Sequence, residues 1–329
     1  MVDEWLALRR GVALFIPPDR SLFEISGPDH LSFMHNLTTN AVTQLAIGDG
    51  CRSLLLQKNG RLIADMRLLR LEDSLLALLD QRMIPTALET LQAHLISEQV
   101  SLNDLAASFS LVSIIGPETP TLFNEFALPF PAINLASTVA TVAEVSLLIV
   151  RYDQVGEQGA LLIVPSEHQQ TIRNDFLARG HPIGLVPISD GALDIARIEA
   201  AEPRYQIDFD ESNLPLQLGF DAAIDQQKGC YLGQEVIARV IHLGHVGRRL
   251  AGFVLEQLVP AGTPILHGNE QRGLLTSTTF SRALNRPIGL GMLRYQDASV
   301  GNRLEVVADG VRKGVTVHEI PFYRPGGGA

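Results

Sequence analysis

The stretch "DQQKGCYLGQE", from Asp225 to Glu235, holds one of the two cysteines of the chain. A cysteine just ahead of a helix N-terminus has its thiolate stabilised by unpaired backbone N–H groups and by the helix macrodipole. Lys228 adds positive charge two residues before Cys230, and Gly229 and Gly233 permit backbone conformations that other residues avoid. The pattern predicts a reactive thiol. The alternative is a buried cysteine that packs as a small apolar residue, and local chemistry alone leaves the two balanced.

The segments on either side of this stretch differ in kind. Downstream, "GQEVIARVIHLG" predicts a helix with these side chains inward: Val236, Ile237, Val240 and Ile241. Upstream, from Arg204 to about Tyr231, neither helical nor strand periodicity is present, and a loop of that length is usually functional or disordered. Its many apolar side chains exclude disorder. We therefore expect an ordered, functional loop.

The remaining sequence predicts two architectures. After Gly247, short β-like runs separated by turn residues indicate a small all-β barrel or sandwich. Before the loop, strands alternate with helices. We expect Asp29 to cap one helix, Ser166 to cap another, and a third to run from about Ser189 to Glu199. The proline-containing region 117–140 is expected to be irregular.

An Asn-Gly pair in "QKNGR" lies between two apolar runs and predicts a β-hairpin. In the returning strand, "RLIADMRLLRL", alternation places Asp65 and Arg67 on one face. Aspartate is depleted within strands, so Asp65 is either a site carboxylate lining a cavity or one half of an ion pair with Arg67.

Two further residues are candidates for ligand contacts. Glu199 lies near the C-terminus of a predicted helix, where the macrodipole disfavours an acid. It either accepts hydrogen bonds from an amidine-like N–H edge of a ligand or is a solvated surface carboxylate, with Glu202 as its neighbouring competitor. Tyr231 is a candidate for stacking on a flat heterocycle and, equally, for ordinary packing.

Composition bounds the class of protein. The formal net charge of −10 opposes a broad electrostatic grip on nucleic acid. Two cysteines and no apparent signal peptide favour a reducing, cytoplasmic setting. No apolar run reaches the length of about 20 residues that a membrane-spanning helix needs, and no histidine or cysteine spacing indicates a metal site. We expect a cytoplasmic monomer with no metal.

Taken together, these pieces resemble the YgfZ family, within the folate-binding proteins related to the glycine-cleavage T-protein (aminomethyltransferase). The specific block is "KGCYLGQEVIAR" (Lys228–Arg239). Weaker support comes from "RIEAAEP" (Arg197–Pro203), "HNLTTNAV" (His35–Val42), "GRLIADMRL" (Gly60–Leu68) and "GEQGALLIVP" (Gly156–Pro165).

The resemblance implies an α+β fold: a T-protein-like folate-binding core of two interleaved α/β lobes over residues 1–246, and a C-terminal β-barrel over 247–329, around a central cavity. It implies tetrahydrofolate, or a folate derivative, as cofactor, with Glu199 holding the pterin and Tyr231 and Arg239 as further folate contacts. It assigns activity to Cys230, with Lys228 lowering the pKa of its thiol, and places Asp65 at the folate nitrogen region.

The function implied is that of an accessory protein for assembly or repair of iron–sulfur enzymes, which are its client proteins and through which it affects tRNA modification by thiolation. The alternative is a tetrahydrofolate-dependent one-carbon transferase that moves an aminomethyl or methyl group. The chain departs from the family at Ala201, where glycine is usual, and at Ala64-Asp65, where the transferases carry Asp-Asp. The single remaining acid favours the accessory role. A non-catalytic folate store is a third possibility.

Overall fold

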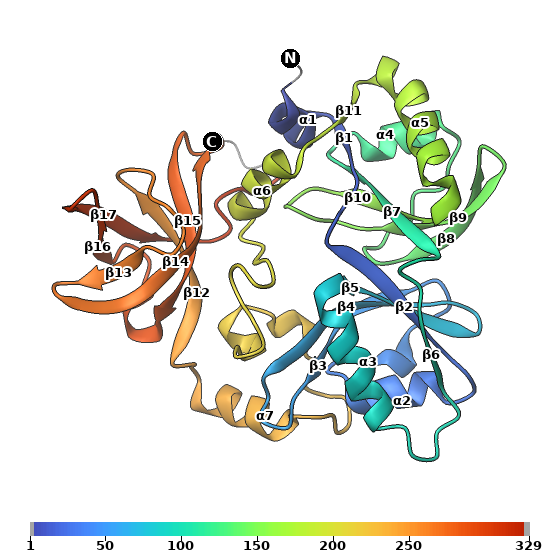
Figure 1. Cartoon of the computed structure of the whole chain (residues 1–329), viewed down its shortest axis with the longest axis horizontal. Helices are drawn as coiled ribbons and strands as arrows, with labels where there is room; N and C mark the ends of the chain where they lie inside the picture. The colour runs from blue at the N-terminus through green and yellow to red at the C-terminus, as the bar shows by residue number, and fades with distance from the viewer. Residues whose placement is uncertain (1–2, 326–329) are drawn as a thin grey trace. The chain divides into compact units, whose positions relative to one another are not determined.

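A computed structural model describes residues 3–325 and divides the chain into two compact units (Figure 1). The first comprises Met1–Asp190 and Ala222–Gln234, and the second comprises Gly191–Asp221 and Glu235–Ala329. The stretch around Cys230 therefore belongs to the first unit, although it follows a segment of the second. No helix among the described residues is long and apolar enough to cross a membrane.

The first unit contains an antiparallel five-stranded sheet in the order β3-β4-β5-β2-β6. Its strands are β2 (Arg20–Ser26), β3 (Gly50–Leu56), β4 (Leu62–Arg70), β5 (Ser74–Asp80) and β6 (Ser101–Asp104). The expected hairpin joins β3 to β4, where the Gln57 N–H donates to the Arg61 carbonyl at 2.8 Å. Helices α2 (His30–Leu37) and α3 (Ile84–Ala93) pack against this sheet.

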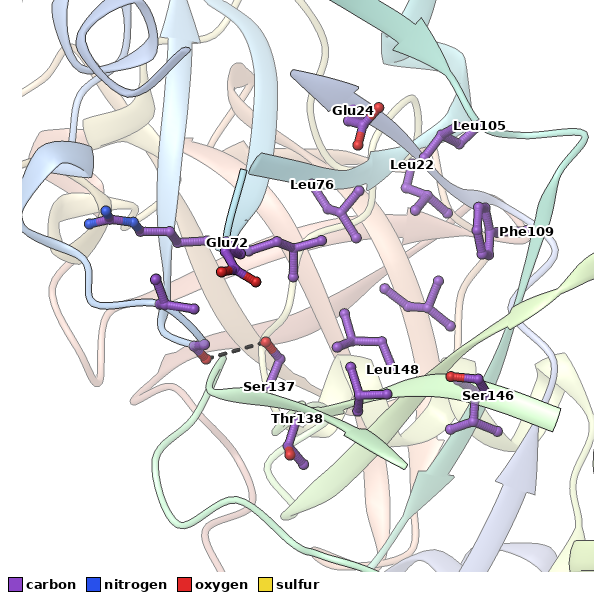
Figure 2. Close-up of a pocket in the computed structure, with 17 residues that line it drawn as sticks. Leu22, Glu24, Glu72, Leu76, Leu105, Phe109, Ser137, Thr138, Ser146 and Leu148 are labelled. Atoms are coloured by element: carbon purple, nitrogen blue, oxygen red, sulfur yellow. Dashed lines mark hydrogen bonds between the residues drawn. The ribbon is translucent and has the colours of Figure 1, made fainter. Parts of the chain in front are cut away.

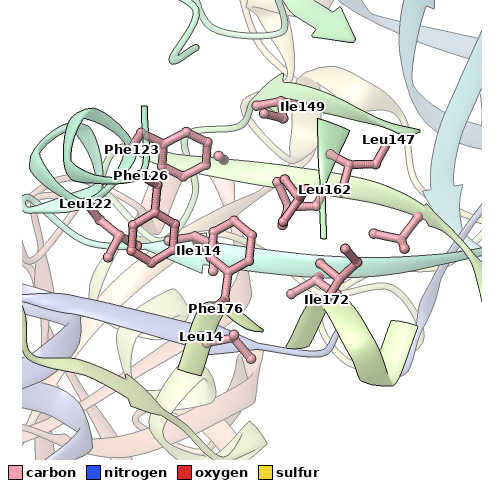
Figure 3. Packing of buried hydrophobic residues seen from close by; sticks show 14 of the residues in the cluster. Leu14, Ile114, Leu122, Phe123, Phe126, Leu147, Ile149, Leu162, Ile172 and Phe176 are labelled. Carbon is pink, nitrogen blue, oxygen red and sulfur yellow. The ribbon is translucent and has the colours of Figure 1, made fainter. Parts of the chain in front are cut away.

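A six-stranded sheet in the order β11-β1-β7-β10-β9-β8 completes the first unit. Its strands are β1 (Val12–Phe15), β7 (Phe109–Ile115), β8 (Ser137–Val142), β9 (Val145–Arg151), β10 (Gly159–Pro165) and β11 (Leu185–Pro187), and α1 (Glu4–Arg10) precedes it. Helices α4 (Thr119–Glu125) and α5 (Gln169–Gly180) cover one face. Figure 3 shows Phe123 of α4, Phe126 directly after α4 and Phe176 of α5 packed near Ile114 and Leu162.

The other face of the six-stranded sheet packs against the five-stranded sheet. Leu22, Leu76 and Leu78 from one sheet meet Leu161 and Ile163 from the other in a single apolar cluster. Side chains alternate between the faces of a strand, so β10 is buried on both sides: Leu162 faces the helices, and Leu161 and Ile163 face the second sheet.

The second unit contains a closed six-stranded barrel in the order β12-β15-β14-β13-β16-β17. Its strands are β12 (Arg248–Leu255), β13 (Pro264–His267), β14 (Glu270–Ser281), β15 (Arg286–Arg294), β16 (Arg303–Ala308) and β17 (Val311–His318). Helix α6 (Asp190–Glu199) packs Ile198 onto Leu250 and Ile288 of the barrel wall. The expected α+β class with a C-terminal β-barrel is confirmed.

Three local expectations are wrong. Region 117–140 contains α4 and the start of β8, because Pro120 stands in the first turn of the helix, where a proline is tolerated. Asp29 precedes α2 but accepts a hydrogen bond from the Gln99 N–H at 2.8 Å and does not cap the helix. Ser166 begins a 3₁₀ turn ahead of α5, and its hydroxyl accepts from Ser110.

The expected ordered loop between α6 and α7 (Gln234–Leu243) is confirmed, and its second-unit part is held by buried groups. The rings of Tyr205, Phe209 and Phe220 pack in a chain. Asp208, whose side chain is 0% exposed, pairs with Arg197 of α6 and accepts from the Ser277 hydroxyl of β14 at 2.7 Å. This network joins loop, helix and barrel.

The network predicts unequal effects for the two carboxylates that contact Arg197. Asp208→Ala leaves the guanidinium buried without its main counter-charge and should lower the free energy of unfolding by about 3–5 kcal/mol. Asp194→Ala removes a partner that is 35% exposed and should cost about 0–1 kcal/mol. Urea unfolding of both variants checks this, and similar losses would contradict the assignment.

Candidate functional site

The loop that carries Cys230 is attached to the first unit at three points, of which the first is Thr39. The Thr39 hydroxyl donates to the Ala223 carbonyl at 2.7 Å, and the Thr39 carbonyl accepts from the Asp225 N–H at 2.9 Å. The Asp225 carboxylate then accepts from the Gln227 N–H at 2.7 Å, which closes a local turn. These bonds fix the path of the loop just before Lys228.

The second attachment is the ammonium of Lys228. It is buried and donates to the carbonyls of His35 and Thr38, at the C-terminal end of α2. Those carbonyls lack partners within their own helix and carry the negative end of its dipole, so a cation there is stabilising. Nζ also lies 5.4 Å from the centre of the Tyr231 ring. Burial lowers the pKa of Lys228 from 10.5 to about 8, against the opposing effect of Asp225.

The third attachment is Gly233, which approaches the turn between β3 and β4. Its φ is +80°, and a Cβ there would lie 2.5 Å from the Gln57 carbonyl oxygen. Glycine is therefore required both by conformation and by space. Gly229 differs, because a Cβ would meet nothing within 4 Å and its φ is not in the left-handed region. The expectation of a special backbone geometry holds for Gly233 and is wrong for Gly229.

Cys230 lies between the second and third attachments, and its side chain is exposed. The interpretation of Cys230 as a buried packing residue is therefore wrong. Helix α7 begins at Gln234, which confirms the predicted helix, and Tyr231, Leu232 and Gly233 separate its first residue from Cys230. Cys51, the other cysteine, is partly covered, and burial raises the pKa of its thiol to about 12. Cys230 is thus the accessible thiol of this chain.

Tyr231, the next residue, is buried, in contrast to the exposed Cys230. It is 9% exposed, and burial raises its pKa to about 12. With the ammonium of Lys228 over its ring, Tyr231 packs as part of the loop's own interior. Of the two interpretations of Tyr231, stacking on a flat heterocycle and ordinary packing, the structure agrees with ordinary packing.

Asp65 is buried on β4 and forms two ion pairs. Its carboxylate accepts from Arg52 Nε at 2.8 Å and Nη2 at 3.0 Å, and from Arg67 Nη1 at 2.8 Å. Burial by itself raises the pKa of Asp65, but Arg67 and Arg52 outweigh it and hold the pKa well below the usual range. Arg52 was missed by the sequence analysis. The signal was present, because the β3–β4 register places Arg52 directly opposite Arg67.

Glu199 and Arg239 belong to the second unit. Glu199 is fully buried, and its carboxylate accepts from the Ser281 hydroxyl at 2.8 Å and the Ala283 N–H at 3.1 Å. The solvated-carboxylate alternative is therefore wrong. Arg239 is exposed on α7. Of the α7 side chains expected inward, only Ile237 is buried.

The first unit thus brings together Lys228, Cys230 and Tyr231 on one anchored loop. Asp65 lies in a separate two-arginine clamp on β4. Among the described residues, no group of three or more histidine, cysteine or acidic side chains is placed to hold a metal ion. The chemistry available at the loop is that of an exposed thiol on a backbone with three attachments to the first unit.

The two glycines of the loop provide a matched test of its geometry. Gly233→Ala should lower the free energy of unfolding by at least about 1–3 kcal/mol, because of the left-handed φ and the contact with the Gln57 carbonyl. Gly229→Ala should change stability by less than about 1 kcal/mol, because the added methyl group meets open space. Thermal and urea unfolding measure both, and equal effects would show that Gly233 is not in close contact with the turn.

The buried ammonium predicts a pH dependence. The chain has three lysines, so a ¹³Cε-lysine spectrum gives three signals, and Lys228→Met identifies one. That signal should titrate near pH 8. The unfolded chain holds this proton up to about pH 10.4, so unfolding takes up a proton between these values. The free energy of unfolding should then rise from pH 8 to 10, by at most about 1.4 kcal/mol per pH unit relative to Lys228→Met. A titration midpoint above 10 would contradict a desolvated ammonium.

Comparisons with known proteins agree over most of the chain, and the two family models leave residues 229–247 between them. A family model described as "GCVT N-terminal domain" matches residues 1–228, and one described as "Glycine cleavage T-protein C-terminal barrel domain" matches residues 248–324. An aminomethyltransferase of Symbiobacterium thermophilum is 28% identical, covering 98% of this chain and 89% of the relative. One of Chloroherpeton thalassium is also 28% identical, covering 97% and 89%.

A solved structure supports the same fold. The glycine cleavage system aminomethyltransferase T from Bartonella henselae superposes with a TM-score of 0.87, covering 98% of this chain and 89% of that one, at 19% sequence identity. At this identity the likeness shows the fold. The two family models together extend from the first sheet to the last barrel strand. The chain therefore belongs to the glycine cleavage T-protein family.

Proposed function

We propose that this protein binds a tetrahydrofolate and acts with it, through Cys230, as a YgfZ-type accessory protein for iron–sulfur enzymes. The single observation that carries the proposal is the exposed thiol of Cys230 on a loop held by Lys228 and Gly233. Both anchoring residues belong to the Lys-Gly-Cys-Tyr-Leu-Gly-Gln-Glu block that resembles the YgfZ family. The block thus has a physical role, which is to present one thiol in a fixed place.

The donor set fits a folate in part. Ser281 and Ala283 hold the Glu199 carboxylate in one orientation, and because this carboxylate is fully buried, a contact with the N–H edge of a pterin requires the residues that cover it to move aside. Arg239 offers an exposed guanidinium for a folate carboxylate. Tyr231 contributes less than the sequence implied, because its ring already packs against Lys228.

The clamp on Asp65 supports the accessory role over group transfer. A general acid or base works best when its pKa lies near the working pH. Arg52 and Arg67 hold the pKa of Asp65 far below that range, so the carboxylate stays ionised and is a weak proton acceptor. In the proposal, Asp65 serves as a fixed negative charge on β4 and not as a proton acceptor.

The second candidate is aminomethyl transfer to or from tetrahydrofolate. The relatives that match nearly the whole chain are named aminomethyltransferases, which favours this candidate more directly than any comparison favours the accessory role. This candidate requires that the purified protein forms a folate product and that the rate of this reaction depends on Asp65.

Cys230 and Cys51 provide a matched pair of variants, because they are the two cysteines of the chain. In cells that lack the protein, Cys51→Ala should restore an iron–sulfur-dependent tRNA thiolation to the wild-type level, and Cys230→Ala should restore less than a tenth of it. Calorimetry should show unchanged tetrahydrofolate affinity for Cys230→Ala and at least tenfold weaker affinity for Glu199→Gln.

Other outcomes separate the alternatives. Full rescue by Cys230→Ala would overturn the role of the thiol. If Cys230→Ala rescues fully and Glu199→Gln also weakens tetrahydrofolate binding, the protein is a folate store. Formation of a folate product by purified protein, lost at least 100-fold in Asp65→Asn, would establish the transferase. Absence of tetrahydrofolate binding by the wild type would overturn all three.

A further inference from the structure

A cavity that contains none of the residues discussed as functional opens between the two sheets of the first unit. Its volume is about 770 Å³, within the range of small-molecule sites. Figure 2 shows Leu22, Glu24 and Leu76 of the five-stranded sheet on one side, and Ser137, Ser146 and Leu148 of the β8–β9 hairpin on the other. Because both walls belong to one compact unit, its geometry is fixed by that unit alone.

The cavity is a part of the core between the sheets that side chains do not fill. Leu22, Leu76 and Ile163 line it and are buried, whereas Leu71, Leu105, Phe109 and Leu148 pack on the same cluster and are only partly buried. Twisted sheets that pack face to face diverge toward their corners, and here no side chain fills the gap. At the rim, Ile47 and Val139 are 63% and 67% exposed. The walls therefore offer apolar surface to an apolar body.

One charged group stands within this apolar face. Glu24 lies mid-strand in β2 and pairs across the sheet with Leu76. Among the described residues it forms no ion pair, and its carboxylate accepts one hydrogen bond, from Asn103 Nδ2 at 3.2 Å and at an exposed position. Because Glu24 lines the cavity and has no cationic partner among the described side chains, its carboxylate is the place where a bound cation would be attracted.

The other charged residues of the lining set the sign of the site. Glu72 adds a second carboxylate at the turn between β4 and β5. The Arg70 guanidinium donates through Nη1 to the Leu45 carbonyl, so it is engaged by the loop beside the cavity. Two carboxylates and one guanidinium leave a net charge of −1 on the lining.

We propose that this cavity binds a small amphipathic cation, with an apolar or aromatic body against the leucines and one ammonium group at Glu24. Hydrophobic burial would supply the affinity, and the unpaired carboxylate would select against anions. The proposal is independent of the proposed folate function, and the acidic lining makes the cavity unsuited to a folate tail.

Three probes that share one body test the proposal on the full chain: 4-phenylbutylamine, 4-phenylbutanol and 4-phenylbutyrate, titrated by calorimetry. The amine should bind at least tenfold more tightly than the butyrate, with the alcohol between them. Glu24→Gln should weaken amine binding at least tenfold and change alcohol binding less than twofold. Glu125→Gln, a surface change on α4 outside the cavity lining, should leave all three affinities unchanged.

A blocking variant locates the binding. Ser146 lines the cavity from an exposed position on β9, so Ser146→Trp should fill the mouth without disturbing the core, as an unchanged melting temperature would show. All three probes should then lose binding. Two results with the wild type would overturn the proposal: equal affinity for the amine and the butyrate, or no amine binding at millimolar concentration. Two results with variants would also overturn it: undiminished amine binding by Glu24→Gln, or retained binding by a folded Ser146→Trp variant.

Discussion

The buried ammonium of Lys228, bonded to the last carbonyls of α2, is the constraint on which the candidate site depends. A lysine loses hydration and side-chain entropy when it is buried, so its position is stable only because the helix end supplies acceptors and a favourable dipole. In return, the lysine ties the segment around Cys230 to a helix almost 200 residues earlier in the chain. The thiol is exposed, and the backbone that carries it is held on both sides, by the hydrogen bonds of Lys228 and by the close approach of Gly233 to the β3–β4 turn.

Gly233 completes this arrangement from the other side. Its close approach to the Gln57 carbonyl lets the loop rest on the β3–β4 turn, which itself depends on the Asn59-Gly60 pair. The Lys-Gly-Cys-Tyr-Leu-Gly-Gln-Glu block is therefore better described as two anchors flanking a thiol than as a thiol activated by a helix. This also explains why Gly229, which has open space around it, contributes nothing comparable to the anchoring.

The two sheets of the first unit share one interface, and its two ends differ in charge and in packing. Near one end of β4, the buried carboxylate of Asp65 has two cationic partners, Arg52 and Arg67. Near the other end, the same face is apolar and incompletely filled, with Glu24 uncompensated. A compensated cluster stabilises and orients, whereas an uncompensated carboxylate beside a cavity favours a ligand of opposite charge. Membership of the glycine cleavage T-protein family accounts for the shared fold.

The sequence by itself determined the architecture: the β-hairpin at Asn59-Gly60, the shared face of Asp65 and Arg67, the helix ending at Glu199 and the barrel after Gly247 all follow from local periodicity and turn chemistry. Only the tertiary structure decided which residues these side chains contact. Lys228 reaches α2, Arg52 joins Asp65, Asp29 turns to Gln99, and α7 buries Ile237 alone, because each depends on contacts between distant segments. Local patterns specify which face a side chain occupies, and long-range packing specifies what that face meets.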